Sequence, residues 1–150
     1  MTDLDAIQAA LAEARSAAEA GEVPIGAVIV RDGEIVARGQ NRVLCHNDPT
    51  AHAEIVAIRE AARILGNYRL NGCSLFVTLE PCAMCAGAMI HARIDRLVFA
   101  AADPKAGACG SVLSVLNHPQ LNHKMAIEQG IMADEARELL RSFFRERRSV

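Results

Sequence analysis

Two short motifs hold the residues of this 150-residue sequence that point to the most specific chemistry. The first is His52-Ala53-Glu54, and the second is Pro81-Cys82-Ala83-Met84-Cys85. A His-x-Glu triplet is weak by itself, because roughly 0.4 copies are expected by chance in this composition. Pro-Cys-x-x-Cys is expected by chance under about 1% of the time. Together the motifs supply an imidazole, two thiols and a carboxyl group, which indicates a metal site with an acid–base residue beside it.

The spacing of the cysteines favours a single metal ion. Cys82 and Cys85 are three residues apart, so on a helix their side chains share one face. A helix is expected over 82–92, with both cysteines in its first turn, where free N–H groups favour thiolates. His52 is expected in the first turn of a helix over 51–66, so two helix starts point at one ion. Two thiolates and one imidazole leave the fourth position of a tetrahedral Zn²⁺ open, which is the catalytic pattern.

An open zinc site predicts hydrolytic chemistry. Zinc lowers the pKa of its water toward about 7 and so provides hydroxide at neutral pH. Glu54 is not needed as a ligand and is placed to carry the proton. Three other interpretations stay open at this point. The cysteines could be ordinary core residues, a structural zinc could take a fourth ligand from His91 or Cys73, and Glu54 could be an ordinary acid of a first helical turn.

Alternating helix and strand patterns must position these motifs. Besides the two helices above, apolar periodicity predicts a helix over 4–18, and the chain end 133–148 has a helical composition. Runs of β-branched and apolar residues predict five strands, at 25–30, 34–39, 74–79, 96–101 and 124–129. We therefore expect an α/β fold, a three-layer α/β/α sandwich with a five-stranded mixed sheet, in a single domain over 1–150.

The connections between these elements carry weaker signals. Asp32-Gly33 between the first two strands predicts a hairpin turn. Residues 42–50 are expected to form a loop, with Thr50 as the N-cap of the following helix. The long connection 103–123 is expected to hold one helical turn at 111–116.

Composition excludes several function classes. Hydrophobic residues make up 51% and charged residues 23%, so disorder is excluded. No apolar run is long enough to span a bilayer, and the acidic N-terminus is unlike a signal peptide, so we expect a soluble cytoplasmic protein without membrane contact. An odd number of cysteines, five, argues against a disulfide framework. A net charge of −2 gives no broad basic surface. Residues 137–148 are the exception, with five Arg against two Glu.

Taken together, the motifs form the H-x-E…P-C-x-x-C signature of zinc deaminases. The sequence resembles the cytidine-deaminase-like zinc deaminase superfamily and, more closely, the bacterial tRNA-specific adenosine deaminases. The metal motif identifies only the superfamily, whereas NDPTAHAEI, DPKAGACGS and the Phe-Phe-Arg tail point to the tRNA branch. The similarity extends over most of the chain, through EVPIGAVIV, GQNR, NDPTAHAEI, NYRL, LFVTLEPCAMCAGAMIHARI, DPKAGACGS and FFRERR.

This resemblance implies a role for each matching residue. It makes His52, Cys82 and Cys85 the zinc ligands and Glu54 the proton shuttle. Asn41 would hydrogen-bond the flipped nucleoside. The remaining substrate contacts that it implies are Pro24 and Ile25 at the base pocket, Asp103 by the ribose and backbone, and His118 near the flanking nucleotides. It also implies a homodimer that converts adenosine to inosine at the wobble position of an arginine tRNA.

The C-terminal helix is the best cationic candidate for holding the anticodon stem-loop. Arg141, Arg145, Arg147 and Arg148 are expected largely on one side of that helix, and Phe144 with its neighbour Phe143 could stack on a splayed base. The same segment could be only an amphipathic packing helix.

The sequence departs from the family at one position that matters for RNA binding. Ala102 stands where the family has a basic residue, so affinity for RNA would rest on Arg42, Lys105 and the C-terminal arginines. Two of the implied substrate contacts also have a purely structural interpretation, because Asn41 could simply end a strand and Asp103 could stabilise a turn.

Two rival functions remain at the level of sequence. One is a deaminase of a free base or nucleotide such as guanine or cytosine, which the near-neutral charge favours. The other is a zinc-stabilised RNA-binding module without catalysis, which Glu54 and the open zinc position oppose.

Overall fold

A computed structural model of the chain describes residues 1–148, and the last two residues of the expected 1–150 domain lie outside the described residues. Five strands form one sheet in the order β2-β1-β3-β4-β5. β1 runs antiparallel to both its neighbours, whereas β3, β4 and β5 are parallel. This confirms the expected five-stranded mixed sheet. The strands are β1 (Gly26–Arg31), β2 (Glu34–Gln40), β3 (Cys73–Leu79), β4 (Arg96–Ala101) and β5 (Ala126–Gln129).

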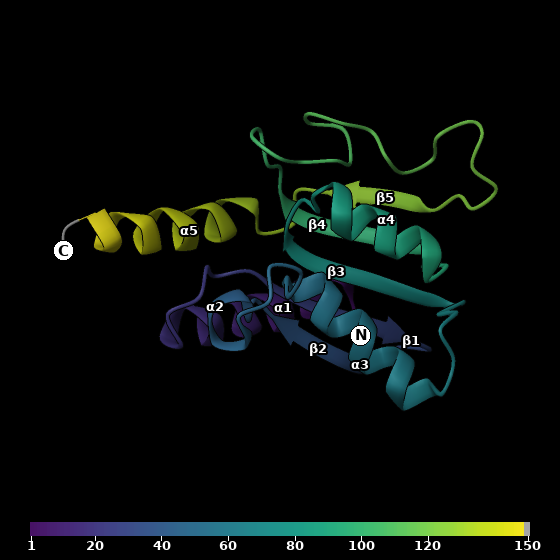
Figure 1. Cartoon of the computed structure of the whole chain (residues 1–150), viewed down its shortest axis with the longest axis horizontal. Helices are drawn as coiled ribbons and strands as arrows, with labels where there is room; N and C mark the ends of the chain where they lie inside the picture. Colours follow the sequence, from purple (N-terminus) through teal and green to yellow (C-terminus); the bar gives the residue numbers. More distant parts are fainter. Residues whose placement is uncertain (149–150) are drawn as a thin grey trace.

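Helices cover both faces of this sheet, as Figure 1 shows. The helices are α1 (Asp3–Glu19), α2 (Val43–His46), α3 (Ala53–Leu65), α4 (Ala83–His91) and α5 (Ala133–Arg148). Alanines of α3 and α4 pack with Leu75 and Val77 of β3 on one face. Ile7 and Leu11 of α1, together with the start of α5, pack with Phe76 on the other. The α/β/α sandwich is therefore confirmed, and the rest of α5 extends away from the sheet (Figure 1). Among residues 1–148, no helix combines the length and apolarity needed to cross a membrane.

Glycine at position 39 lets α3 approach the sheet closely. A Cβ placed on Gly39 would lie 2.7 Å from the backbone nitrogen of Ala57, in the middle of α3. Such a contact is far inside van der Waals distance, so any side chain there would push the helix outward. The start of α3, which carries His52 and Glu54, is therefore held against β2 by the absence of a side chain.

Several boundaries differ from the sequence expectations by one or two residues. The helix expected over 51–66 begins at Ala53, and His52 is its N-cap. The helix expected over 82–92 begins at Ala83, with Cys82 as N-cap. Thr50 is not the cap, because its hydroxyl and backbone N–H both donate to Asp48. Both helices begin one residue later than His52 and Cys82, because these two residues have extended backbone conformations and so cannot belong to the helix itself.

Two connections also differ from expectation. Residues 43–46 form the short helix α2, because the buried carboxylate of Glu22 accepts hydrogen bonds from the backbone N–H groups of Leu44 and Cys45. Glu22 is more than twenty residues away along the chain, so no local pattern could show this contact. Residues 111–116 contain no helical turn. They form turns and a β-bridge between Cys109 and Ser114.

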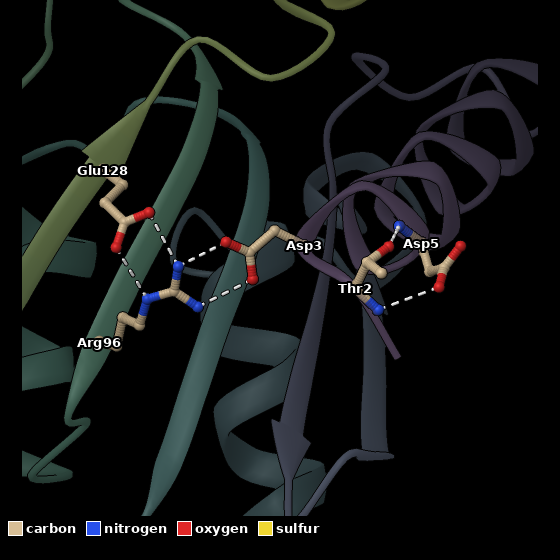
Figure 2. A network of polar contacts seen from close by, with 5 residues as sticks. All are labelled: Thr2, Asp3, Asp5, Arg96 and Glu128. Carbon is tan, nitrogen blue, oxygen red and sulfur yellow. Dashed lines mark hydrogen bonds and ion pairs between the residues drawn. The ribbon is translucent and has the colours of Figure 1, made fainter.

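A network of ion pairs joins α1 to the strands β4 and β5 (Figure 2). Arg96 at the start of β4 donates to both carboxylate oxygens of Asp3, at 2.9 and 2.5 Å, and to those of Glu128 in β5. The hydrogen bonds from Arg96 hold the pKa of Asp3 below its usual value. Beside it, Thr2 and Asp5 cap the start of α1 reciprocally. One guanidinium thus joins the helix layer to two parallel strands.

Replacing Gly39 with alanine tests the close approach of α3. We expect Gly39→Ala to destabilise the fold by about 1–3 kcal/mol, because the new methyl group overpacks the helix–sheet contact. The melting temperature, measured by circular dichroism, should fall by several degrees. Gly87→Ala in α4 is the control, because a Cβ there meets no atom within 4 Å. Equal melting temperatures for Gly39→Ala and the wild type would contradict the packing argument.

Candidate active site

Two helix N-termini meet just beyond the carboxyl end of β3. His52 is the N-cap of α3, Cys82 is the N-cap of α4, and Cys85 is the third residue of α4. Nδ1 of His52 lies 3.7 Å from Sγ of Cys82 and 3.5 Å from Sγ of Cys85. These atoms all lie within 4.8 Å of one another, which makes this the one such group of His, Cys, Asp and Glu found in the described part of the chain. The structure thus brings the three expected ligands together.

The geometry and chemistry of these three donors fit a tetrahedral metal ion. A metal–sulfur bond of about 2.3 Å and a metal–nitrogen bond of about 2.0–2.1 Å separate the sulfur and nitrogen ligands of a tetrahedral site by about 3.6 Å. The observed separations match that value, and two sulfurs with one imidazole form a soft donor set. His91 lies at the far end of α4 and Cys73 at the opposite end of β3. Neither belongs to the group, so the alternative of a structural site completed by His91 or Cys73 is wrong.

The surroundings of the thiols favour a bound cation. A hydrogen bond from the Cys85 thiol, with a second from His52, lowers the pKa of Cys82 to about 3. The same hydrogen bond, together with burial, raises the pKa of Cys85. The hydrogen bond with Cys82 also raises the pKa of His52. The cluster therefore holds a thiolate at neutral pH, at the amino end of a helix whose dipole favours negative charge.

Glu54 lies beside this cluster without belonging to it. Its side chain is buried, with 4% of its surface exposed. Burial raises the pKa of Glu54 to about 7. A carboxyl group with that pKa exchanges protons readily at neutral pH, which is the property required of a general acid–base residue.

Asn41 connects the end of β2 to the start of α3. Its side-chain oxygen Oδ1 accepts a hydrogen bond of 2.8 Å from the backbone N–H of Ala53. Its own backbone N–H donates to the carbonyl of Ile25, at 3.2 Å, and the buried Pro24 directly precedes Ile25. Asn41, Ile25 and Pro24 therefore lie together next to the cluster. Because Oδ1 faces the helix, the amide nitrogen Nδ2 is the end that remains to donate to a ligand.

Asp103 opens the loop after β4. Its Oδ1 accepts hydrogen bonds from the backbone N–H groups of Lys105 and Ala106, so the turn interpretation is correct for this oxygen. Asp103 also lines a cavity of about 450 Å³, between this loop and α5, together with Leu79, which lies three residues before Cys82 in the chain. The cavity brings together Lys105 with Arg137 and Arg141, two of the five arginines of the 137–148 segment.

Some side chains of α5 pack against the rest of the protein, and others are exposed to solvent. Phe143 is half-buried and lies under the guanidinium of Arg147, which donates to the carbonyl of Gly21. Phe144 is 44% exposed and lines the cavity beside Asp103. The expectation that Arg147 shares one side with the other three arginines is wrong, because Arg147 turns toward α1. Arg141, Arg145 and Arg148 line a hollow beside Phe144, and Arg145 pairs with Glu138 at 3.2 Å.

His118 does not lie next to the cluster of His52, Cys82 and Cys85. Its Nδ1 accepts from the backbone of Gln120, and its carbonyl accepts from Lys124. The adjacent Asn117 makes two hydrogen bonds with the backbone of Met125, just before β5. His118 therefore lies toward the amino ends of β4 and β5, whereas the cluster follows the carboxyl end of β3.

Comparisons with known proteins agree with this geometry. The chain matches the MafB19-like deaminase family over residues 1–148. It is 51% identical to a tRNA-specific adenosine deaminase of Agrobacterium fabrum over 142 residues, which cover 95% of this chain and 93% of the relative. A solved structure from work on A-to-I editing by tRNA:A34 deaminases at the wobble position of transfer RNA superposes with a TM-score of 0.88 and 49% identity. That match covers 91% of this chain and 99% of the other.

The chain belongs to the tRNA-specific adenosine deaminases. It is therefore an enzyme with the fold of the cytidine-deaminase-like superfamily, as the resemblance of its motifs implied. A guanine deaminase of Bacillus subtilis is also similar, with a TM-score of 0.67 and 45% identity, over 73% of this chain and 71% of that one. The fold therefore does not by itself determine which purine a deaminase accepts.

The cluster predicts how the purified deaminase binds metal. We expect about one ion per chain, with two sulfurs and one nitrogen from the protein. His52→Ala and Cys82→Ala should lose the ion, measured by plasma mass spectrometry. Cys45→Ala should keep it, because Cys45 is exposed and outside the group. X-ray absorption that shows four protein ligands would contradict the open coordination position.

Proposed function

We propose that this chain deaminates adenosine to inosine at the wobble position of a tRNA anticodon, with an arginine tRNA as substrate. The observation that carries the proposal is the buried Glu54 beside three metal-binding side chains in a chain of this family. Three protein ligands leave one tetrahedral position for water, which is the arrangement of catalytic sites. A non-catalytic RNA-binding module would need neither that open position nor an acid–base residue next to it.

Zinc is the metal that we propose for the cluster. His52, Cys82 and Cys85 would hold it, and the mixture of thiolates and imidazole is typical of zinc ligands. When bound there, zinc supplies Lewis-acid chemistry, which makes water acidic enough to act as a nucleophile near neutral pH.

Glu54 carries the protons of the proposed reaction. Water adds to C6 of adenine, and Glu54 takes the proton that the water loses and delivers it to the ring nitrogen N1. The same carboxyl group then takes the second proton of the added water from the new C6 hydroxyl and passes it to the exocyclic amine. The C6–N bond breaks, C6 becomes a carbonyl carbon, and ammonia leaves. A pKa of about 7 for Glu54 suits both directions of transfer.

Asn41, Pro24 and Ile25 form the proposed wall for the flipped nucleoside. Nδ2 of Asn41 can donate a hydrogen bond, because Oδ1 is already bonded to Ala53. Pro24 and Ile25 provide apolar surface next to it. A nucleotide taken out of the anticodon stack needs both apolar contacts and a hydrogen bond of this kind.

The cavity between the 103–105 turn and α5 is the proposed contact for the nucleotides around the target. Asp103 and Phe144 line it together with three cations, Lys105, Arg137 and Arg141. Arg145 lies with Arg141 and Phe144 in the neighbouring hollow. These charges supply the local positive surface that a protein of net charge −2 otherwise lacks. A contact of His118 with flanking nucleotides stays a prediction from the family resemblance alone.

The remaining parts of the proposal concern the oligomeric state, the domain organisation and the cellular location of the protein. We expect a homodimer, supported by large apolar side chains exposed on α3, on α4 and in the loop between α3 and β3. They are Ile64 at 49%, Tyr68 at 69% and Met84 at 37%. We further propose that residues 1–150 form a single zinc deaminase domain that acts on tRNA in the cytoplasm.

The alternative substrate is a free purine such as guanine. The similarity to a guanine deaminase favours it, whereas the family membership and the cationic cavity favour RNA. The deciding experiment incubates the zinc-loaded protein with an anticodon stem-loop of an arginine tRNA and, separately, with free guanine and adenosine. Inosine at the wobble position is the expected product. Rapid release of ammonia from guanine with no inosine in the RNA would show that the tRNA proposal is wrong.

Glu54→Ala tests the proton transfer. We expect kcat on the stem-loop to fall by about 10²–10⁴-fold, because a positioned acid–base group contributes that much. Metal content and melting temperature should stay close to those of the wild type, because Glu54 is not a ligand. Glu60→Ala, on the exposed side of the same helix, should keep full activity. Near-normal turnover by Glu54→Ala would assign the proton transfer to another group.

The cations of the cavity predict a dependence on salt. In the double variant Lys105→Gln with Arg141→Gln, we expect the KM for the stem-loop to rise. The slope of log KM against log salt concentration should also fall by about 1 for each phosphate that the variant no longer neutralises. Arg31→Gln is the matched control, because Arg31 lies at the opposite end of the sheet. An unchanged slope in the double variant would mean that these side chains do not contact phosphate.

A further inference from the structure

Glu80 is a buried carboxylate that the proposed reaction does not use. It follows β3 directly, stands two residues before Cys82, and is 2% exposed. Both of its oxygens accept hydrogen bonds from one loop. Oε1 accepts from the backbone N–H of Asp103 at 3.0 Å and from the hydroxyl of Ser111. Oε2 accepts from the backbone N–H groups of Cys109, at 2.9 Å, and Ser111, at 3.1 Å.

The loop over 103–111 is closed tightly around this carboxylate. A Cβ on Gly107 would lie 2.5 Å from Oε1 of Glu80, so only glycine lets the backbone pass there. Ala108 donates its N–H to the carbonyl of Pro81, the residue between Glu80 and Cys82. The loop is therefore attached at its start, its middle and its end to Glu80 and Pro81, the two residues directly before Cys82.

These contacts connect the two halves of the proposed substrate site. Cys82 holds the metal side, and Asp103 with Lys105 lines the cavity proposed for the neighbouring nucleotides. Glu80 is the one side chain among the described residues that is bonded to both ends of the 103–111 loop. Hydrogen bonds to a buried charge are strong, so removing the charge leaves several backbone N–H groups without a good acceptor.

We propose that Glu80 is a positioning residue for the RNA substrate, which fixes the 103–111 loop relative to the metal-binding helix so that Asp103 and Lys105 face the bound nucleotides. This inference rests on the proposed function. It assigns Glu80 no contact with the reacting atoms. It therefore predicts an effect on substrate binding that exceeds the effect on the chemical step, because the loop contacts substrate away from C6.

The test compares Glu80→Gln with Glu34→Gln in the zinc-loaded full chain. Glutamine keeps the shape of Glu80 but turns an NH₂ group toward N–H donors. Glu34 is an exposed glutamate at the far end of the sheet, so the same chemical change there serves as the control. We expect Glu80→Gln to raise the KM for the stem-loop by about tenfold or more, with kcat changed by no more than about twofold and one metal ion retained.

Hydrogen exchange provides a readout that needs no substrate. The amides of 103–111 should exchange at least about tenfold faster in Glu80→Gln than in the wild type, whereas α3 and β3 should exchange as before. Unchanged exchange in the loop, or an unchanged KM, would overturn the proposal. So would an equal fall of kcat and kcat/KM, because that pattern would assign Glu80 to the chemical step.

A milder variant decides the question if Glu80→Gln does not fold. Ser111→Ala removes one of the four hydrogen bonds and leaves the carboxylate in place. We expect a smaller but measurable increase in both loop exchange and KM, and wild-type values of both would overturn the proposal. If the wild type itself makes no inosine in the stem-loop, the proposed function is wrong. The exchange experiment would then still report whether Glu80 holds the loop.

Discussion

Two helix N-termini meet at the carboxyl end of β3, and the packing of the whole molecule serves to keep them there. A tetrahedral metal ion needs sulfur and nitrogen donors about 3.6 Å apart, and here the donors come from segments thirty residues apart in the chain. The sheet satisfies this requirement, because α3 packs on β2 while α4 continues from β3 on the same face. Close packing through Gly39 and the alanines of α3 is therefore a condition of the chemistry as well as of stability.

Three buried glutamates, Glu22, Glu54 and Glu80, differ in their pKa values because they differ in their hydrogen-bond donors. Burial would raise the pKa of Glu22 and of Glu80, but hydrogen bonds outweigh it and hold both pKa values below the usual range. Glu22 accepts them from backbone N–H groups, and Glu80 accepts them from the hydroxyl of Ser111 and from backbone N–H groups. Glu54 has no comparable set of donors, and burial raises its pKa to about 7. The first two carboxylates are thus charged groups that organise loops, whereas the third is suited to exchange protons.

The distribution of charge explains how a slightly acidic protein can act on RNA. Cations of α5 and of the 103–105 turn line one cavity and the hollow next to it, so positive charge gathers locally at this side of the molecule. At physiological salt, charges act over about 8 Å, so local concentration matters more than the net value of −2. The packing of Phe143 and Arg147 against the end of α1 holds the helix that presents these charges.

Features that depend on local spacing could be predicted from the residues alone. The ligand set was predicted from the His-x-Glu triplet and from two cysteines at i and i+3. The five strands and the layered fold were predicted from the β-branched runs and from the helical patterns at 4–18 and 133–148, because these patterns follow the short-range periods of the backbone. Contacts between segments far apart in the chain became visible only in the folded structure. These include the formation of α2 under Glu22, the direction of the Asn41 amide, the divergence of Arg147 from the other arginines and the enclosure of Glu80. Such contacts depend on which backbone groups and side chains the completed fold brings within hydrogen-bond distance, and no periodicity in the residues themselves encodes that.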